Sequence, residues 1–272
     1  MSPNTKTRIL SSLAIVLILA VLFYLGKEFV LLTIMFASMG IVDEVFTNFF
    51  KMSRSSVEYL FSQTSLVAPF LILFFGPKNP MLIDGALILG AVVNIGMIYF
   101  LFKANIKSEK LKIFSFLTGI FFLLPLIALG TIFTYDKWIT LIVGLFIINF
   151  GMDTGAFIFG KWMGKHKLWP KVSPNKTVEG LIGGMFTSAT LGGLFWNYFI
   201  GDIGLGLFFL FALFGMLSQV GDLLQSKFKR IVGIKDSSNL IPGHGGIYDR
   251  VDSLIFLAPF FSLALKYLYI RG

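Results

Sequence analysis

The chain has 272 residues, of which 56% are apolar and only 14% are charged, and its mean hydropathy is +0.84. A soluble fold of this size cannot bury so much apolar surface, since soluble domains carry about 25% charged residues, so soluble enzymes and disordered or fibrous classes are excluded. The net charge of +9 fits cytoplasmic loops that meet phosphates. The absence of cysteine excludes disulfides, thiolate zinc sites and cysteine nucleophiles.

Nine apolar stretches approach the roughly 20 residues that a membrane-spanning helix needs. In chain order they are residues 9–25, 29–50, 59–75, 81–102, 113–133, 138–159, 178–200, 203–224 and 251–269. The first resembles a signal peptide but lacks a small-residue cleavage pattern near Tyr24, so we expect it to be retained. The second contains Asp43 and Glu44, and either spans in full or ends early with residues 45–50 in the interface. We therefore expect an all-α polytopic bundle of about nine transmembrane helices, and assign no role to Asp43, Glu44 or Asp84.

The distribution of lysine and arginine predicts the orientation of this bundle. Nine spans leave 18 of the 23 basic residues on the side of the N-terminus. The other five are Lys27, Lys78, Lys137, Lys266 and Arg271. Because basic loops stay cytoplasmic, we expect a multi-pass inner (cytoplasmic) cell membrane protein whose N-terminus and loops 160–177 and 225–250 face the cytoplasm. Along the sequence, residues 1–150 would form the N-terminal and middle helices and 151–272 the catalytic region.

Charged residues mark the start of the second of these loops. If the preceding helix continues past Leu224, then Asp222, Ser226, Lys229 and Arg230 lie on one stripe of its surface. A carboxylate and a hydroxyl beside two cations suit a metal ion next to a polyphosphate. The alternative is a solvated helix end whose basic residues meet lipid headgroups.

A glycine-rich stretch, residues 242–246, follows in the same loop and leads into the last apolar helix at Asp249 and Arg250. Glycines let backbone N–H groups approach an anion, and a helix N-terminus favours negative charge, which outlines a phosphate cradle at Gly245 and Gly246. Glycine clusters also form plain turns. His244 is equally suited to a phosphate contact and to a structural hydrogen bond.

The run from Ser226 to Asp252 closely resembles the signature of the phosphatidate cytidylyltransferases, also called CDP-diacylglycerol synthases. Its residues are Ser226-Lys227-Phe228-Lys229-Arg230, Lys235-Asp236 and Ile241-Pro242-Gly243-His244-Gly245-Gly246-Ile247-Tyr248-Asp249-Arg250-Val251-Asp252. No departure from the pattern is visible. The nine-span length and the C-terminal position of the motif are also similar to the bacterial members of this family.

The first loop and its flanking helices look like a second block of the same family. This block comprises Asp153-Thr154-Gly155-Ala156-Phe157, Gly160-Lys161, Gly164-Lys165 and residues 173–180. From the residues alone, Asp153 inside an apolar helix is either functional or a buried carboxylate paired with a loop lysine. Ser173-Pro174 favours a turn or helix start, so Lys176 and Glu179 would lie on the first turn of the next helix.

Two other features of this loop have simpler interpretations. His166, between two lysines, is expected on the surface of the loop. Gly180 and Gly184, spaced at i and i+4, favour a helix-packing face over a ligand site.

The resemblance implies a reaction in which CTP and phosphatidate give CDP-diacylglycerol and diphosphate, with Mg²⁺ as cofactor and a second cation left open. Asp222 and Asp249 would hold the metal. The other implied site residues are Lys229, Arg230, Lys235 and Arg250 on the phosphates, Ser226 and Asp236 as orienting groups, His244 in the glycine-rich stretch, and Asp153, Lys176 and Glu179 from the first loop.

The expected partners are CTP, phosphatidate and the lipid bilayer, with no nucleic acid; a homodimer stays open. The nearest alternative is another CTP-dependent membrane enzyme, such as a polyprenol or phytol kinase or an ether-lipid cytidylyltransferase. A transporter is a remoter one.

Overall fold

The computed structural model describes residues 3–77, 79–102 and 112–269, without the side chains of residues 3–9 and 12. Of the basic residues counted above, five lie outside this part of the chain: Lys78, Lys103, Lys107, Lys110 and Arg271.

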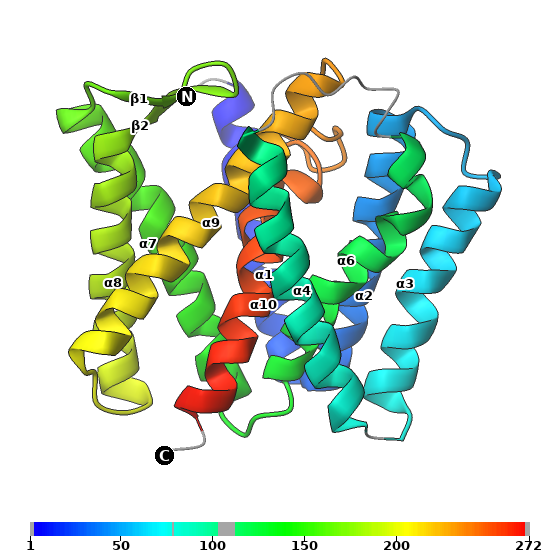
Figure 1. The fold of residues 1–272 in the computed structure, drawn as a ribbon, viewed down its shortest axis with the longest axis horizontal. Helices are drawn as coiled ribbons and strands as arrows, with labels where there is room; N and C mark the ends of the chain where they lie inside the picture. Colours follow the sequence, from blue (N-terminus) through cyan, green and yellow to red (C-terminus); the bar gives the residue numbers. More distant parts are fainter. Residues whose placement is uncertain (1–2, 78, 103–111, 270–272) are drawn as a thin grey trace. The chain divides into compact units, whose positions relative to one another are not determined.

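The described residues are mainly helical, as predicted (Figure 1). The helices are α1 (Pro3–Leu25), α2 (Lys27–Glu44), the π-helix η1 (Val45–Phe50), α3 (Val57–Phe75), α4 (Pro80–Phe102), the 3₁₀-helix η2 (Lys112–Leu117), α6 (Thr118–Ile132), α7 (Trp138–Met163), α8 (Val178–Phe199), α9 (Leu205–Ile231) and α10 (Tyr248–Leu268). Between α7 and α8, the strands β1 (Lys167–Trp169) and β2 (Ser173–Thr177) form an antiparallel pair, with Lys167 opposite Thr177.

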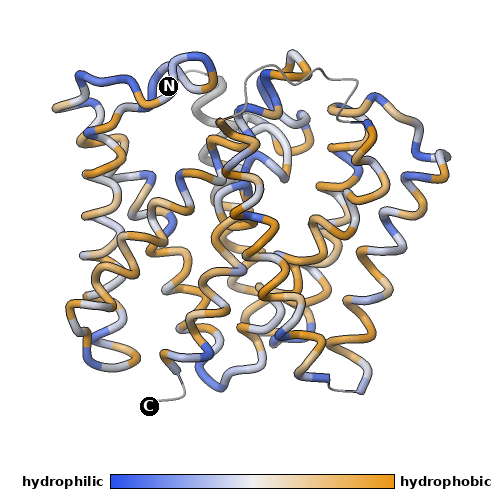
Figure 2. Tube along the Cα trace, viewed as in Figure 1, coloured by the Kyte–Doolittle hydropathy of each residue, from blue (hydrophilic) through white to orange (hydrophobic). Residues whose placement is uncertain are grey.

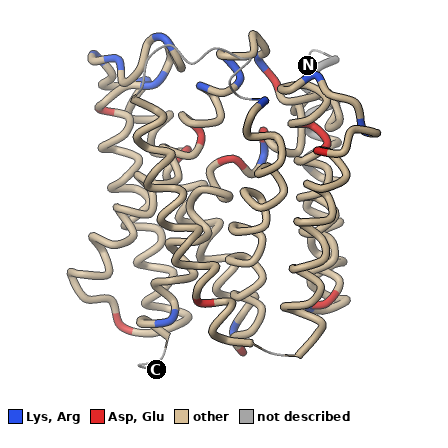
Figure 3. Tube along the Cα trace, turned by 45° about the vertical axis from the view of Figure 1, so that its right-hand side comes forward, with Lys and Arg blue, Asp and Glu red and all other residues tan. Residues whose placement is uncertain are grey.

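Eight helical segments of the described chain are long and apolar enough to cross a membrane. They are Lys27–Phe50, Val57–Phe75, Pro80–Phe102, Lys112–Ile132, Trp138–Met163, Val178–Phe199, Leu205–Ile231 and Tyr248–Leu268. The first predicted span is also helical, with a shorter apolar helix over Leu13–Leu25. Hydrophobic residues fill the middle of the long helices (Figure 2), and lysine and arginine gather at helix ends and in loops (Figure 3). The protein is therefore a polytopic helical membrane protein.

The second span does not end at Glu44, because the helix continues as the π-helix η1 to Phe50. Lys51, in the left-handed region with φ 54°, terminates it. Val45, Phe46 and Phe49 are buried, as is Phe50. The helix therefore continues to Phe50 within a segment long enough to span, and the aromatic side chains of residues 45–50 pack inside the protein.

The chain forms two compact units, each assembled from separate segments of the sequence. The first unit comprises residues 1–90, 103–133 and 228–251, and the second comprises residues 91–102, 134–227 and 252–272. The glycine-rich stretch thus belongs to the first unit, and the loop between α7 and α8 to the second. The predicted boundary at residue 150 divides the chain by sequence position, which is a different kind of division from these units, and it stays a prediction.

Small residues let α7 and α8 pack closely in the second unit. A Cβ atom added to Gly180 would lie 2.7 Å from the carbonyl oxygen of Ala156, and one added to Gly184 would lie 2.7 Å from that of Met152. The predicted helix-packing face at Gly180 and Gly184 is therefore confirmed. Ser188 Oγ adds a hydrogen bond between the two helices, to the carbonyl oxygen of Ile148 at 2.9 Å.

Candidate active site

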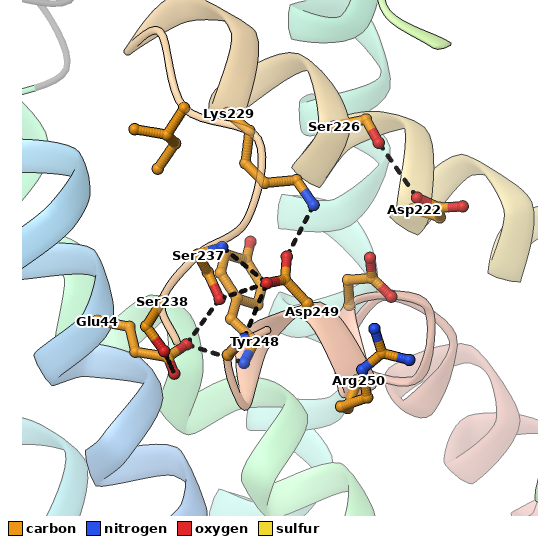
Figure 4. A network of polar contacts seen from close by, with 12 residues as sticks. Glu44, Asp222, Ser226, Lys229, Ser237, Ser238, Tyr248, Asp249 and Arg250 are labelled. Carbon is orange, nitrogen blue, oxygen red and sulfur yellow. Dashed lines mark hydrogen bonds and ion pairs between the residues drawn. The ribbon is translucent and has the colours of Figure 1, made fainter. Parts of the chain in front are cut away.

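In the first unit, the carboxylate of Glu44 at the end of α2 binds the segment that connects α9 to α10 (Figure 4). Its Oε1 accepts hydrogen bonds from Ser238 Oγ at 2.7 Å and from the N–H of Ile247 at 2.8 Å. Its Oε2 accepts them from Ser237 Oγ at 2.9 Å and from the N–H of Tyr248 at 3.0 Å. Glu44 is only 4% exposed, so these four bonds compensate for the burial of its charge.

A second carboxylate, Asp249, lies on the first turn of α10 in the same unit. Its Oδ1 accepts a hydrogen bond from Lys229 Nζ on α9 at 2.7 Å. Its Oδ2 accepts hydrogen bonds from the N–H of Ser237 at 2.7 Å and that of Gly246 at 3.0 Å. The side chains of Lys229 and Asp249 are 11% and 6% exposed, so this is a buried ion pair. The structure thus brings together two of the predicted site residues, Lys229 and Asp249.

The glycine-rich stretch and the residues that follow it donate backbone N–H groups to the carboxylates of Glu44 and Asp249. Gly243 and Gly245 have φ values of 78° and 90°, a region that favours glycine. A Cβ atom on Gly246 would lie 2.0 Å from Ser237 Oγ and 2.6 Å from both Glu44 oxygens, so only glycine fits there. Glycine was expected here for close approach of the backbone to an anion. In this structure the N–H group of Gly246 meets the carboxylate of Asp249, and the next two N–H groups meet Glu44.

His244 and Arg250 complete the local structure of this stretch. The Nδ1 atom of His244 lies 2.8 Å from Ser11 Oγ on α1, which is the structural hydrogen bond named as one of its two alternatives. Arg250 Nη2 donates to the carbonyl oxygen of His244 at 2.6 Å, although the Arg250 side chain is exposed.

Besides Arg250, three predicted site residues of the first unit have exposed, charged side chains. Arg230 donates to the carbonyl oxygen of Ile234 at 3.3 Å, and the residue is exposed. Lys235 and Asp236 are exposed, and among the described residues their side chains are not part of the hydrogen bonds given above for Glu44 and Asp249. These side chains are accessible to a charged ligand.

In the second unit, four predicted site residues from three elements lie close together. Lys176 Nζ on β2 donates to Oδ2 of Asp222 on α9, across 46 residues of sequence. Ser226 Oγ, one turn further along α9, donates to Oδ1 of the same carboxylate at 3.2 Å (Figure 4). Asp153 on α7 interacts electrostatically with both Asp222 and Lys176. The Lys176 and Asp222 side chains are 21% and 31% exposed, so water reaches this pair more easily than the Lys229 and Asp249 pair.

The element that carries Lys176 differs from the prediction. Residues 173–177 form strand β2 and not the beginning of a helix. The helix starts only after Thr177, whose Oγ1 caps it by accepting the N–H of Gly180 at 3.1 Å. A threonine cap and pairing with β1 therefore prevail over the helix-start signal of Ser173-Pro174.

Glu179 lies on the first turn of α8, as predicted. Its carboxylate accepts hydrogen bonds from the N–H of His166 at 3.2 Å, and His166 Nδ1 lies 2.6 Å from Oε1. The His166 side chain is 78% exposed, which confirms its position on the loop surface. In this structure Glu179 therefore orders the α7–α8 loop.

The carboxylates at Asp222 and Asp249 offer hard oxygen ligands of the kind that Mg²⁺ prefers. In the described part of the chain, no group of three or more His, Asp or Glu side chains forms a metal cluster. Mg²⁺ usually takes one or two carboxylates and completes its coordination with water and substrate phosphates. Asp222 and Asp249 each supply one carboxylate of this kind, and each is paired with a lysine that a metal ion would have to replace.

Sequence reasoning missed Glu44, Ser237 and Ser238. An ionisable residue inside an apolar helix marks Glu44 as unusual. Its serine partners, however, lie 193 and 194 residues further along the chain. They belong to a loop in which the charged residues and glycines carried the functional signal and these two serines carried none.

The fold defines a polytopic helical membrane protein that carries clusters of charged side chains near the ends of α2, α9 and α10. Residues 6–268 match the sequence model of the cytidylyltransferase family, and the chain belongs to this family.

Among similar proteins, the phosphatidate cytidylyltransferase of Staphylococcus aureus (strain COL) is 44% identical over 162 residues, 56% of this chain and 61% of the relative. The phosphatidate cytidylyltransferase of Staphylococcus haemolyticus (strain JCSC1435) is 40% identical over 179 residues, 63% of this chain and 67% of the relative. The match thus spans less than two thirds of the S. aureus protein.

Proposed function

We propose that the protein transfers the cytidylyl group of CTP to phosphatidate, giving CDP-diacylglycerol and diphosphate for phospholipid biosynthesis. The observation that carries the proposal is the signature run 226–252 in a chain of the cytidylyltransferase family, with its Lys229 and Asp249 joined in a buried ion pair. The named activity of the Staphylococcus relatives supports phosphatidate as the lipid substrate.

In this reaction a phosphate oxygen of phosphatidate attacks the α-phosphorus of CTP, the bond from that phosphorus to the bridging oxygen breaks, and diphosphate leaves. No side-chain nucleophile is needed, so catalysis consists of positioning and charge stabilisation. Lys176, Lys229, Arg230, Lys235 and Arg250 would bind the phosphate oxygens of the two substrates. The ligands would be oriented by Asp153, Glu179, Ser226 and Asp236. The absence of side chains at Gly245 and Gly246 would let the backbone approach a phosphate group closely.

Asp222 and Asp249 would hold Mg²⁺, which when bound neutralises charge on the departing diphosphate. The lysines paired with these carboxylates, Lys176 and Lys229, would then become available to phosphate oxygens. A second cation is compatible with this donor chemistry.

We further propose that the protein lies in the inner cell membrane with its N-terminus and both charged loops in the cytoplasm. The distribution of basic residues, 18 against 5, supports this orientation. It also gives both loops access to cytoplasmic CTP.

The test is an assay of the purified protein with phosphatidate in detergent and labelled CTP, with and without Mg²⁺. We expect CDP-diacylglycerol and diphosphate to form only with the metal. Release of CDP with a phosphorylated lipid would indicate a lipid kinase instead. Ion or solute flux in liposomes without CTP turnover would indicate a transporter.

The carboxylates give a sharper prediction. Asp222→Asn or Asp249→Asn should lower kcat by orders of magnitude while the protein stays folded, because an amide is a weaker ligand for Mg²⁺. Asp202→Asn, at an exposed position between α8 and α9, is the matched control and should keep near-normal turnover. Near-normal kcat at saturating Mg²⁺ in either of the first two variants would remove that aspartate from the proposed site.

A further inference from the structure

We infer that Glu44 is a positioning residue for the proposed site: its carboxylate fixes the direction in which Asp249 presents its oxygens. The inference rests on the proposed function, since Asp249 is one of the carboxylates proposed to hold Mg²⁺. Glu44 is 4% exposed and uses both oxygens for hydrogen bonds within the protein, two bonds on each. It therefore acts through its neighbours and not by touching substrate.

A single serine connects the two carboxylates. Ser237 is fully buried, and its Oγ lies 2.9 Å from Oε2 of Glu44 and 2.9 Å from Oδ2 of Asp249 (Figure 4). The hydroxyl has one hydrogen, so it donates to one of these oxygens at a time. The N–H of Ser237 also donates to Oδ2 of Asp249, at 2.7 Å. A displacement of Ser237 therefore changes two of the contacts that orient Asp249.

The helix that carries Glu44 also contacts the α9–α10 segment directly, through a hydrogen bond and through close packing. Asn48, on η1, donates from Nδ2 to the carbonyl oxygen of Ser237 at 2.8 Å. A Cβ atom on Gly40, one turn before Glu44, would lie 2.8 Å from Cδ1 of Ile247. The α2–η1 helix therefore packs directly against the segment and limits how it can adjust when Glu44 is changed.

The negative charge of Glu44 is required by the groups that it binds. Two of them are the N–H groups of Ile247 and Tyr248 at the N-terminus of α10, where the helix dipole favours an anion. A glutamine offers one oxygen and one NH₂ group, so in either orientation its NH₂ faces one of these N–H donors. A buried donor that loses its acceptor is costly, and we expect the segment to shift to avoid it.

Glu44→Gln and Asp43→Asn form a matched pair of variants. The two carboxylates are neighbours on α2, and each substitution removes one negative charge with almost no change in size. Oδ1 of Asp43 accepts hydrogen bonds from Arg54 Nε at 2.6 Å and from the Tyr59 hydroxyl at 3.2 Å. Neither partner belongs to the segment around Ser237. For both variants we would measure kcat, the KM for CTP, the Mg²⁺ concentration at half-maximal activity, and the rise in unfolding temperature caused by Mg²⁺ with CTP.

We expect Glu44→Gln to lower kcat by about tenfold or more and to raise the half-maximal Mg²⁺ concentration by a similar factor, as substitutions behind a metal ligand do. The KM for CTP should change by less than about threefold, and the stabilisation by Mg²⁺ with CTP should shrink. Asp43→Asn should leave kcat and the Mg²⁺ response within about twofold of the wild type. Glu44→Asp, which keeps the charge, should recover part of the Mg²⁺ response.

If Glu44→Gln does not fold, Ser237→Ala provides the decisive measurement, because it removes the shared hydroxyl while Glu44 keeps three hydrogen bonds. A wild-type Mg²⁺ response in folded Glu44→Gln, or in Ser237→Ala, would overturn the inference. Failure of the wild-type protein to make CDP-diacylglycerol would count against the proposed function instead. In that case the stabilisation by Mg²⁺ with CTP still separates Glu44→Gln from Asp43→Asn.

Discussion

At the scale of single residues, the two lysine–carboxylate pairs differ in how far water reaches them. Lys229 and Asp249 are almost completely buried, whereas Lys176 and Asp222 keep about a fifth and a third of their side-chain surface. Removing one partner of a buried pair leaves an uncompensated charge, while an accessible carboxylate is rehydrated. The same chemical change should therefore have different consequences for stability at the two positions.

We predict that Lys229→Met lowers the free energy of unfolding by about 3 kcal/mol and Lys176→Met by about 1 kcal/mol or less. Unfolding by denaturant in detergent micelles without Mg²⁺ measures both losses. Lys229→Arg retains the positive charge and is the control for a change of side chain that leaves the charge in place. Equal losses in the two methionine variants would show that burial does not separate the pairs.

The sequence identified Asp222, Lys229 and Asp249 because each is a charged residue at the edge of an apolar helix. It could not identify Glu44 as the partner of Ser237. The two residues are 193 positions apart in the sequence, and whether they meet depends on how α2 packs, which no local pattern encodes. The glycine-rich stretch was correctly interpreted as a place of close backbone approach, but local sequence does not say whether the approaching anion is a ligand or a carboxylate of the protein.

At the scale of elements, the close contact of α7 and α8 supports the loop that presents Lys176. A Cβ atom on Gly184 would meet both the backbone oxygen and the side chain of Met152 at 2.7 Å, so the helices would have to separate. Gly96, on α4, has nothing within 4 Å of such an atom. These two glycines therefore distinguish a packing role from a general effect of glycine in a helix.

We predict that Gly184→Ala lowers the free energy of unfolding by about 1–3 kcal/mol because of overpacking. Gly96→Ala should be neutral or raise it by up to about 1 kcal/mol, since alanine is the better helix former. Thermal and chemical unfolding in detergent compare the two variants. A loss at Gly96 as large as that at Gly184 would contradict the close-packing explanation.

The helices were predictable because each is an apolar run of near-spanning length, and the structure places helix at all nine positions. The β1–β2 pair was not predictable in the same way. Its strands are three and five residues long and consist largely of polar or exposed residues, so they carry no hydrophobic alternation. The pairing of Lys167 with Thr177 and the threonine cap on α8 determine this region.

At the scale of the whole molecule, the order of the helices fixes which loops share a side of the membrane. The loops between α7 and α8 and between α9 and α10 are separated by two spans, so they should emerge on the same side. The loop between α8 and α9 should emerge on the opposite side. Because the natural chain has no cysteine, each loop can be marked by one introduced thiol without removing others.

We predict that single cysteines at Lys171 and Asn239 react with a membrane-impermeant thiol reagent only from the cytoplasmic side, and that one at Gly201 reacts only from the outside. All three positions are exposed, and nothing lies within 4 Å of a Cβ atom at Gly201, so reactivity should report sidedness and not burial. The excess of basic residues gives the direction, because lysine- and arginine-rich loops are retained in the cytoplasm. Intact cells or right-side-out vesicles, with permeabilised samples as the control for total reactivity, supply the measurement. Labelling of Lys171→Cys and Asn239→Cys from the outside would reverse the orientation, and labelling of these two on opposite sides would mean that α8 and α9 do not both cross.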